Sequence, residues 1–277
     1  MQFLRNLTWW FIGLTTTVLF VLVLILSDLL AGLFWNVPRT TLITVYVALA
    51  LGFVNKVKLF RLGETLIHEV GHAQMVAFTF GKVKFIRVER DTSGVTSYAR
   101  PGLLFGRINE ALVSLFGPIS SSVVFLITTR LVSSELTAYW AMGAGLFIFL
   151  ILLTTVRNLW GWITGLALLA MLYLVLESSG YVDPKLLEVG SLNDTKILLV
   201  NVILGITAFN LGSALQYSVM CRNPKSPNMD EFKFSKAVFI PPWIGGRLII
   251  LVQLILLWIS LSFLLGWPSA FEVGRLL

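Results

Sequence analysis

Two histidines and a glutamate stand one helical turn apart in the stretch TLIHEVGHAQ, residues 65–74. On a helix, His68 and His72 occupy positions i and i+4, so their imidazoles share one face. That spacing lets both ring nitrogens bind one zinc ion at roughly 2.0–2.1 Å. Glu69 lies beside them without needing to be a ligand, and it can take a proton from metal-bound water. The pattern therefore predicts a Zn²⁺ site with Glu69 as its catalytic residue.

His68 and His72 are the only histidines among 277 residues. Ionisable side chains inside a membrane segment are costly, so they indicate a functional site more readily than an incidental pair of histidines. Three neighbours keep two interpretations each. Glu64 either orients an imidazole or favours a helix N-terminus through its charge. Gly71 either lets another helix approach closely or is simply a glycine of the kind that membrane helices tolerate. Gln74 could be a polar residue that lines the metal site, but one side chain does not decide this.

The composition indicates a membrane protein, because 57% of the residues are hydrophobic and only 13% are charged. Soluble domains are usually about a quarter charged. The net charge of +7 falls mostly in loops, which is typical of topology signals and contact with anionic lipid. We therefore expect the lipid bilayer as a partner and no nucleic acid. Cys221 is the single cysteine, which excludes an internal disulfide framework.

Long apolar runs alternate with short polar ones along the chain. The expected membrane segments lie at 7–35 (a retained anchor), 40–54, 62–80 with the histidine motif, 109–132, 137–156, 159–176, 195–219 and 238–266. Residues 82–101 are charged and β-branched around the turn at 91–94, which predicts two strands. Residues 55–61, 177–196 and 221–236 are expected to be loops.

These elements predict an all-α polytopic membrane protein with about six to eight membrane segments. A small β-hairpin is inserted after the H-E-x-x-H helix. We expect one membrane-embedded domain over 1–277, with N-terminal membrane helices at 7–61. The H-E-x-x-H helix, the hairpin and a Gly-Pro helix follow at 62–133, and the remaining membrane helices lie at 137–277.

The positive-inside rule gives a topology. It places the acidic loop at 177–196 outside the cell. The basic regions would lie in the cytoplasm, at Arg5, 56–61, 82–107 and 221–236. Both ends of the 62–80 segment then lie on one side. That segment either dips into the membrane and returns, or one basic loop breaks the rule.

At this point the chain resembles a known family. HEVGH in a membrane segment, followed by a polar hairpin and a helix containing FGPIS, resembles the site-2 proteases, the intramembrane zinc metallopeptidases, and especially their short bacterial branch. The matching stretches are ETLIHEVGHA, DTSGVTSYARPG, SLFGPIS, VRNLWGW and NMDEFKFSKAVFIPPW, between residues 64 and 243. The resemblance implies hydrolysis of peptide bonds of membrane-associated proteins in a bacterial cell membrane. His68 and His72 would hold zinc, and Glu69 would act as general base on zinc-bound water.

The third zinc ligand is the point at which this chain departs from better-known members. Those members carry an aspartate in a Leu-Asp-Gly motif, which is absent here, whereas a catalytic zinc usually has three protein ligands. Asp230 in PNMDEF is the first candidate, and Asn158 in VRNLWGW is the alternative, although an amide brings no charge. Asp28 and Asn210 are more distant candidates.

The missing motif keeps a second function open, a catalytically silent relative that acts as a membrane binding or scaffold protein. A third, a transporter, would show repeated halves, and the sequence shows none. The sequence does not indicate an oligomeric state.

The hairpin has two interpretations. The stretch KVKFIRVER could pair its exposed edge with an extended substrate peptide by strand addition. Lys82, Lys84 and Arg87 would then anchor it at the lipid surface. Alternatively, the hairpin only caps the protein at the headgroups.

Overall fold

The computed structural model describes residues 39–54, 58–79, 81–99, 106–133, 137–178 and 192–265. Four expectations fall outside these ranges. They are the first apolar segment at 7–35, the candidate Asp28, the cytoplasmic position of Arg5 and the central part of the acidic 177–196 loop.

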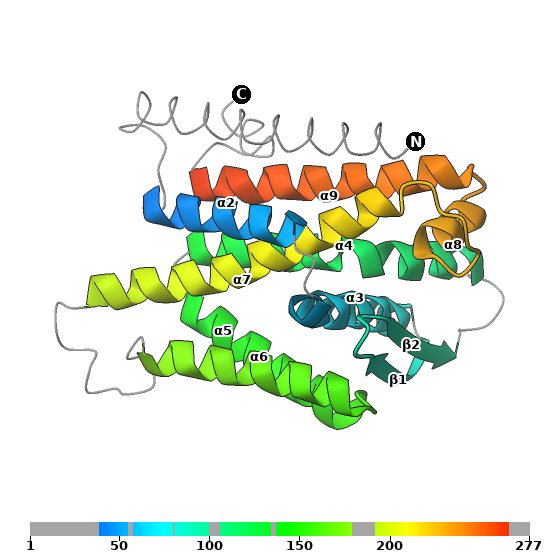
Figure 1. The fold of residues 1–277 in the computed structure, drawn as a ribbon. Coiled ribbons are helices and arrows are strands. Elements are labelled where there is room, and N and C mark those ends of the chain that lie inside the picture. The colour runs from blue at the N-terminus through cyan, green and yellow to red at the C-terminus, as the bar shows by residue number, and fades with distance from the viewer. Residues whose placement is uncertain are drawn as a thin grey trace.

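Eight helices and one hairpin make up the described part of the chain (Figure 1). In chain order they are α2 (Arg39–Val54), α3 (Lys58–Phe78), β1 (Lys82–Val88), β2 (Gly94–Ala99), α4 (Gly106–Ser133), α5 (Thr137–Thr154), α6 (Leu159–Ser178), α7 (Leu192–Met220), α8 (Asp230–Ala237) and α9 (Pro242–Leu265). The mostly helical fold with a small hairpin after the motif helix is confirmed.

Three helices are long and apolar enough to cross a membrane, at Gly106–Val132, Ile197–Met220 and Pro242–Leu265. Shorter apolar helices accompany them at Thr40–Val54, Tyr139–Thr154 and Leu159–Leu174. The motif helix α3 is not among these spans, because Arg61, Glu64, His68, Glu69 and His72 interrupt its apolar character.

The helix α4 lies at the centre of the arrangement and packs against α3, α7, α8 and α9. Figure 1 shows α9, α2 and α7 on one side of it, the α5–α6 pair on the other, and α3 with the hairpin between. One buried apolar cluster joins α2, α4, α7 and α9 around Phe125, Leu204 and Leu211. A second joins α3, β1, α5 and α6 around Leu66, Ile86 and Leu152. The motif helix is therefore held by the second cluster on one side and by its packing against α4 on another.

The hairpin is antiparallel, with Ile86 opposite Thr96 and Val88 opposite Gly94. Its turn is closed by the Glu89 N–H donating to Ser93 O at 2.8 Å. The other edge of β1 is not free. Ile86 N–H donates to Thr155 O at 2.9 Å, and Arg157 N–H donates to Ile86 O at 3.1 Å. The connection between α5 and α6 therefore forms an isolated parallel bridge with β1, at Val156 and Ile86.

Two boundaries differ from the sequence predictions. The helix α3 begins at Lys58, inside the stretch expected to be a loop, and α8 forms within the region 221–236 that was also expected to be a loop. An eight-residue helix is too short to show apolar periodicity. The charges at its ends still suit the helix dipole, since the acidic Asp230 and Glu231 lie in its first turn and the basic Lys236 in its last.

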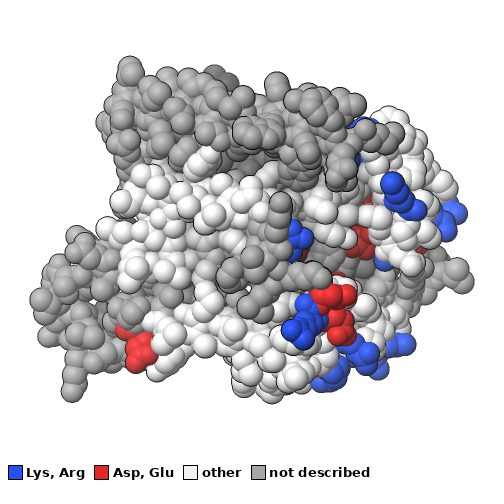
Figure 2. Space-filling view, in the orientation of Figure 1, with Lys and Arg blue, Asp and Glu red and all other residues white. Residues whose placement is uncertain are grey.

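Charged side chains are unevenly distributed over the surface. In Figure 2, lysine and arginine gather at the end of the molecule that carries the hairpin and α8, and the described surface at the opposite end shows none in this view. Such an asymmetry is typical of a membrane protein with one basic side.

Candidate metal centre

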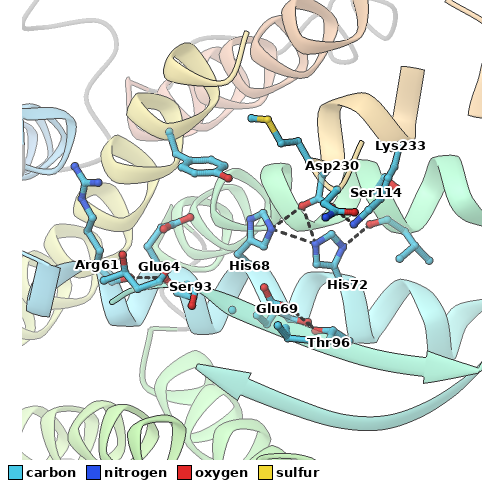
Figure 3. A pocket seen from close by; sticks show the side chains of 18 of the residues that line it. Arg61, Glu64, His68, Glu69, His72, Ser93, Thr96, Ser114, Asp230 and Lys233 are labelled. Atoms are coloured by element: carbon cyan, nitrogen blue, oxygen red, sulfur yellow. Dashed lines mark hydrogen bonds and ion pairs between the residues drawn. The ribbon is translucent and has the colours of Figure 1, made fainter. Parts of the chain in front are cut away.

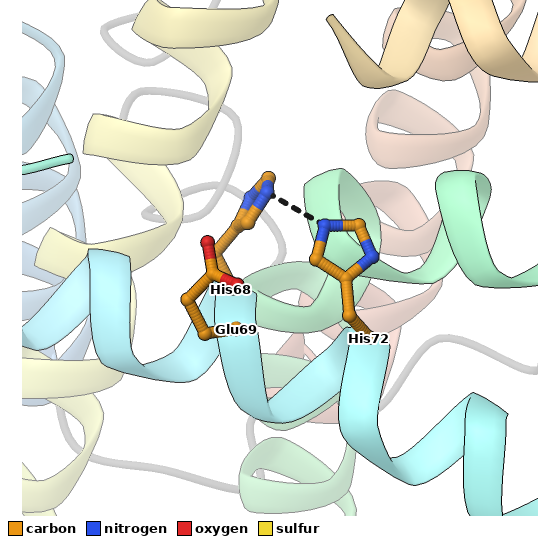
Figure 4. Close-up of side chains that lie close together, drawn as sticks. All are labelled: His68, Glu69 and His72. Carbon is orange, nitrogen blue, oxygen red and sulfur yellow. Dashed lines mark hydrogen bonds between the residues drawn. The ribbon is translucent and has the colours of Figure 1, made fainter. Parts of the chain in front are cut away.

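The helix α3 presents the motif side chains as its spacing predicts. His68 and His72 lie one turn apart with ring centroids 4.7 Å apart, and their Nε2 atoms are separated by 3.1 Å (Figure 4). One donor atom from each of His68, Glu69 and His72 falls within 4.8 Å of the others. The two imidazoles therefore point at one position in space.

Asp230 reaches the same position from the first residue of α8. Its Oδ2 lies 3.0 Å from His68 Nε2 and 3.1 Å from His72 Nε2 (Figure 3). Its other oxygen, Oδ1, lies 3.4 Å from the ammonium of Lys233. The carboxylate comes from 162 residues along the chain from His68, so tertiary packing alone brings it to the motif.

The three donors suit a divalent metal by their spacing. Atoms bound tetrahedrally at about 2.05 Å from zinc lie about 3.3 Å from one another, close to the observed 3.0 and 3.1 Å. Their chemistry agrees. His72 Nδ1–H donates to the backbone carbonyl of Val113 at 2.6 Å, so in the neutral ring Nε2 presents a lone pair. A lone pair facing a carboxylate oxygen needs a proton or a cation between them.

The helix α4 closes on this centre through two glycines. At Gly71 of α3, an added Cβ would lie 2.6 Å from Phe116 O and 2.6 Å from Ser120 Cβ. At Gly117 of α4, an added Cβ would overlap the His72 ring and lie 2.9 Å from His68 Nε2. Gly71 thus admits a close helix, the first of its two interpretations, and the Gly-Pro helix lies directly against both imidazoles.

Glu69 is buried and faces the hairpin (Figure 3). Its Oε2 lies 2.6 Å from the Thr96 hydroxyl of β2. It lines a cavity of about 620 Å³ together with His68, His72 and Asp230. The carboxylate is therefore beside the donors and in the same cavity.

Two acids at the start of α8 titrate differently. Burial alone would raise the pKa of Asp230, but the neighbouring His72 and His68 hold that pKa well below its usual range. Burial raises the pKa of Glu231 to about 7. Glu231 is 1% exposed, and neither of its carboxylate oxygens has a hydrogen-bond partner among the described residues.

The remaining candidates are distributed between the centre and other places. Glu64 lines the same cavity as the histidines. Gln74 and Asn210 line a separate apolar cavity between α3 and the α5–α6 pair. Asn158 is engaged elsewhere, because its amide donates to Val88 O at 2.6 Å and accepts from Val88 N–H at 3.2 Å. Of the two proposed third donors, the structure brings Asp230 to the histidines and uses Asn158 to hold the hairpin.

Sequence reasoning missed Thr96 and the role of Val113 O. A backbone carbonyl carries no sequence signal. Thr96 does lie in the quoted stretch DTSGVTSYARPG, and strand alternation places its side chain on one face with Gly94 and Tyr98. That face is the one turned toward the cavity.

Comparison with known proteins identifies one family. A family model described as Peptidase M50B-like matches residues 41–260, a range that includes the motif, the hairpin and Asp230. No curated protein and no solved structure matches the chain.

Proposed function

Since this chain belongs to the Peptidase M50B-like family, which is the site-2 protease family, we propose that it is an intramembrane zinc endopeptidase. It would hydrolyse peptide bonds of membrane-associated protein substrates. The observation that carries the proposal is the convergence of His68, His72 and Asp230 within 3.1 Å, with Glu69 beside them in one cavity.

His68, His72 and Asp230 would hold the metal. A bound zinc ion supplies a Lewis acid that polarises the substrate carbonyl and makes water more acidic. Two imidazoles and one carboxylate leave a fourth position open, as catalytic zinc sites require. The bond from His72 Nδ1–H to Val113 O fixes the ring so that Nε2 faces the centre.

Glu69 would perform the proton transfers. Its carboxylate takes a proton from the attacking water and delivers it to the nitrogen of the leaving amine. The side chain needs an open space beside the metal ligands for this, which the cavity of about 620 Å³ provides. Lys233 keeps a cation 3.4 Å from the Oδ1 of Asp230, which favours the charged form of that ligand.

The substrate peptide would bind in extended form, because a helix hides its carbonyls in its own hydrogen bonds. Strand addition to the KVKFIRVER edge was one of two interpretations of the hairpin, but the pairing of β1 favours the other strand. β1 is already paired at Ile86 with Thr155 and Arg157. Among the described residues no strand pairs with the other edge of β2, and β2 lines the cavity from Gly94 to Tyr98. A peptide added to β2 would pass the metal centre.

We further propose a multi-pass protein of a bacterial cell membrane, with the basic end that carries the hairpin in the cytoplasm. Three apolar helices of spanning length support the membrane location. The clustering of lysine and arginine at the hairpin end supports the orientation. A cysteine substituted at exposed Arg90 and labelled in intact cells would test it. Labelling by an impermeant reagent from outside would contradict the orientation.

One experiment tests the function. The protein is purified in detergent, its zinc content per chain is measured, and cleavage of a model membrane peptide is compared between the wild type and Glu69→Gln. Stoichiometric zinc with cleavage that depends on Glu69 is the expected result. Cleavage by neither protein, with zinc bound, would favour the silent relative. The main argument for that alternative was the missing Leu-Asp-Gly motif, and the closeness of Asp230 to both histidines supports the protease instead.

A further inference from the structure

The Glu69 carboxylate needs something besides its helix to fix it. The helix α3 sets the position of the Glu69 backbone, but three rotatable bonds separate its carboxylate from the Cα atom. A misplacement of about 1 Å at a catalytic group can cost on the order of 100-fold in rate. The question is therefore which group outside α3 orients this side chain.

The hydroxyl of Thr96 is within reach of two acceptors on Glu69. It lies 2.6 Å from the carboxylate oxygen Oε2 and 2.8 Å from the backbone oxygen. A threonine hydroxyl has a single proton, so it donates to one acceptor at a time. The shorter distance is to the charged acceptor, and bonds to charged acceptors are the stronger kind.

Gly94 restrains the same carboxylate by contact. An added Cβ at this residue would lie 2.6 Å from Glu69 Cγ and 2.8 Å from Cδ. The backbone of β2 therefore lies directly against the Glu69 side chain two residues before Thr96. Together, the two residues restrict the carboxylate by a surface on one side and a donor on another.

The hairpin is itself fixed in place, which gives this restraint a rigid base. Asn158 pairs with both backbone groups of Val88, and the adjoining connection pairs with Ile86. Val88 lies opposite Gly94 and Ile86 lies opposite Thr96 in the hairpin. Gly94 and Thr96, which restrain Glu69, are therefore each paired with a β1 residue that is hydrogen-bonded to the α5–α6 connection.

We propose that Thr96 is a positioning residue for Glu69, holding its carboxylate toward the metal centre through the hydroxyl bond. This inference rests on the proposed function, in which Glu69 is the general base. It assigns the hairpin a part in the chemistry that is separate from any role in pairing with substrate.

The kinetic test compares Thr96→Val, which keeps the shape and removes the hydroxyl, with Thr96→Ser, which keeps the hydroxyl. Ser97→Ala is the matched control, because the neighbouring side chain on a strand points to the opposite face. Thr96→Val should lower kcat by about 10–100-fold, with KM and zinc content unchanged. Thr96→Ser should restore most of kcat, and Ser97→Ala should retain wild-type kcat. Wild-type kcat in Thr96→Val, or a Thr96→Ser variant as slow as Thr96→Val, would overturn the proposal.

A second measurement is independent of activity, so it separates this proposal from the proposed function. The melting temperature of the metal-free protein is measured for Thr96→Val, Glu69→Ala and the double variant. If the hydroxyl bonds the carboxylate, Thr96→Val lowers the melting temperature in the wild-type background and has little effect in Glu69→Ala. An equal loss in both backgrounds would place the bond on the backbone oxygen, and Thr96 would then only tie the strand to the helix.

Discussion

Adding one methyl group at Gly117 should disrupt the metal centre. Alanine in place of glycine normally stabilises a helix interior by about 1 kcal/mol. Here the new Cβ would overlap the His72 ring and lie 2.9 Å from His68 Nε2, whereas nonbonded heavy atoms prefer roughly 3.5–4.0 Å. Relief of that overlap requires the imidazoles to shift by roughly 1 Å, and zinc–ligand distances tolerate about 0.2 Å. We therefore expect zinc affinity to fall at least about 100-fold.

The assay is a competition for zinc between Gly117→Ala and a chelator of known affinity, followed by cleavage of the model peptide. Gly143→Ala is the matched control, because Gly143 lies within α5 and no described atom comes within 4 Å of its added Cβ. That variant should bind zinc and cleave as the wild type does. Undiminished zinc affinity in a folded Gly117→Ala protein would refute the placement of α4 against the imidazoles.

Three further predictions test other parts of the site. Asp230→Asn keeps the shape of the side chain and removes its charge, so zinc affinity should fall at least about 10-fold in chelator competition; an unchanged affinity would remove Asp230 from the ligand set. Asn158→Ala deletes both bonds to Val88 and should lower the free energy of unfolding by about 1–3 kcal/mol while zinc stoichiometry stays at the wild-type value; loss of zinc from a folded variant would instead favour Asn158 as a ligand. Burial raises the pKa of Glu231 from 4.5 to about 7, so its contribution to stability is complete below pH 4.5 and is lost as pH rises through 7. Between pH 5 and 8, metal-free Glu231→Gln should therefore lose less stability than the wild type, by up to about 3 kcal/mol, and equal losses in denaturant titrations would contradict the assignment.

The local parts of this molecule could be read from its sequence because short-range patterns determine them. The i, i+4 spacing of His68 and His72 places both rings on one face of any helix. Alternation and the turn residues at 91–94 predicted the hairpin, which forms at Lys82–Ala99. Apolar run lengths predicted most helices to within a few residues.

The features that depend on long-range packing could not be predicted from the sequence. The sequence placed Asp230 ahead of Asn158 as the third ligand but could not decide between them, because both are polar residues beside apolar runs. The structure distinguishes them, since Asn158 faces the backbone of Val88 and Asp230 faces His68. The sequence also could not show which edge of the hairpin is free, for the same reason. Alternation identifies a strand, but only the tertiary fold shows that the α5–α6 connection covers β1.

Under the proposed function, the position of Asp230 also suggests how water would reach the metal centre of a predominantly apolar chain. Its helix α8 lies between two apolar spans, after Met220 and before Pro242. The cavity that contains the histidines is lined at that end by Asn228, which is exposed, and by Lys233, which is 40% exposed. In the proposed enzyme, water would enter through this polar end of the cavity beside Asp230, which agrees with the rule that polar structure at membrane depth must be shielded by protein. We therefore interpret the short helix α8 as the element that would bring both a carboxylate and a polar opening of the cavity to the motif.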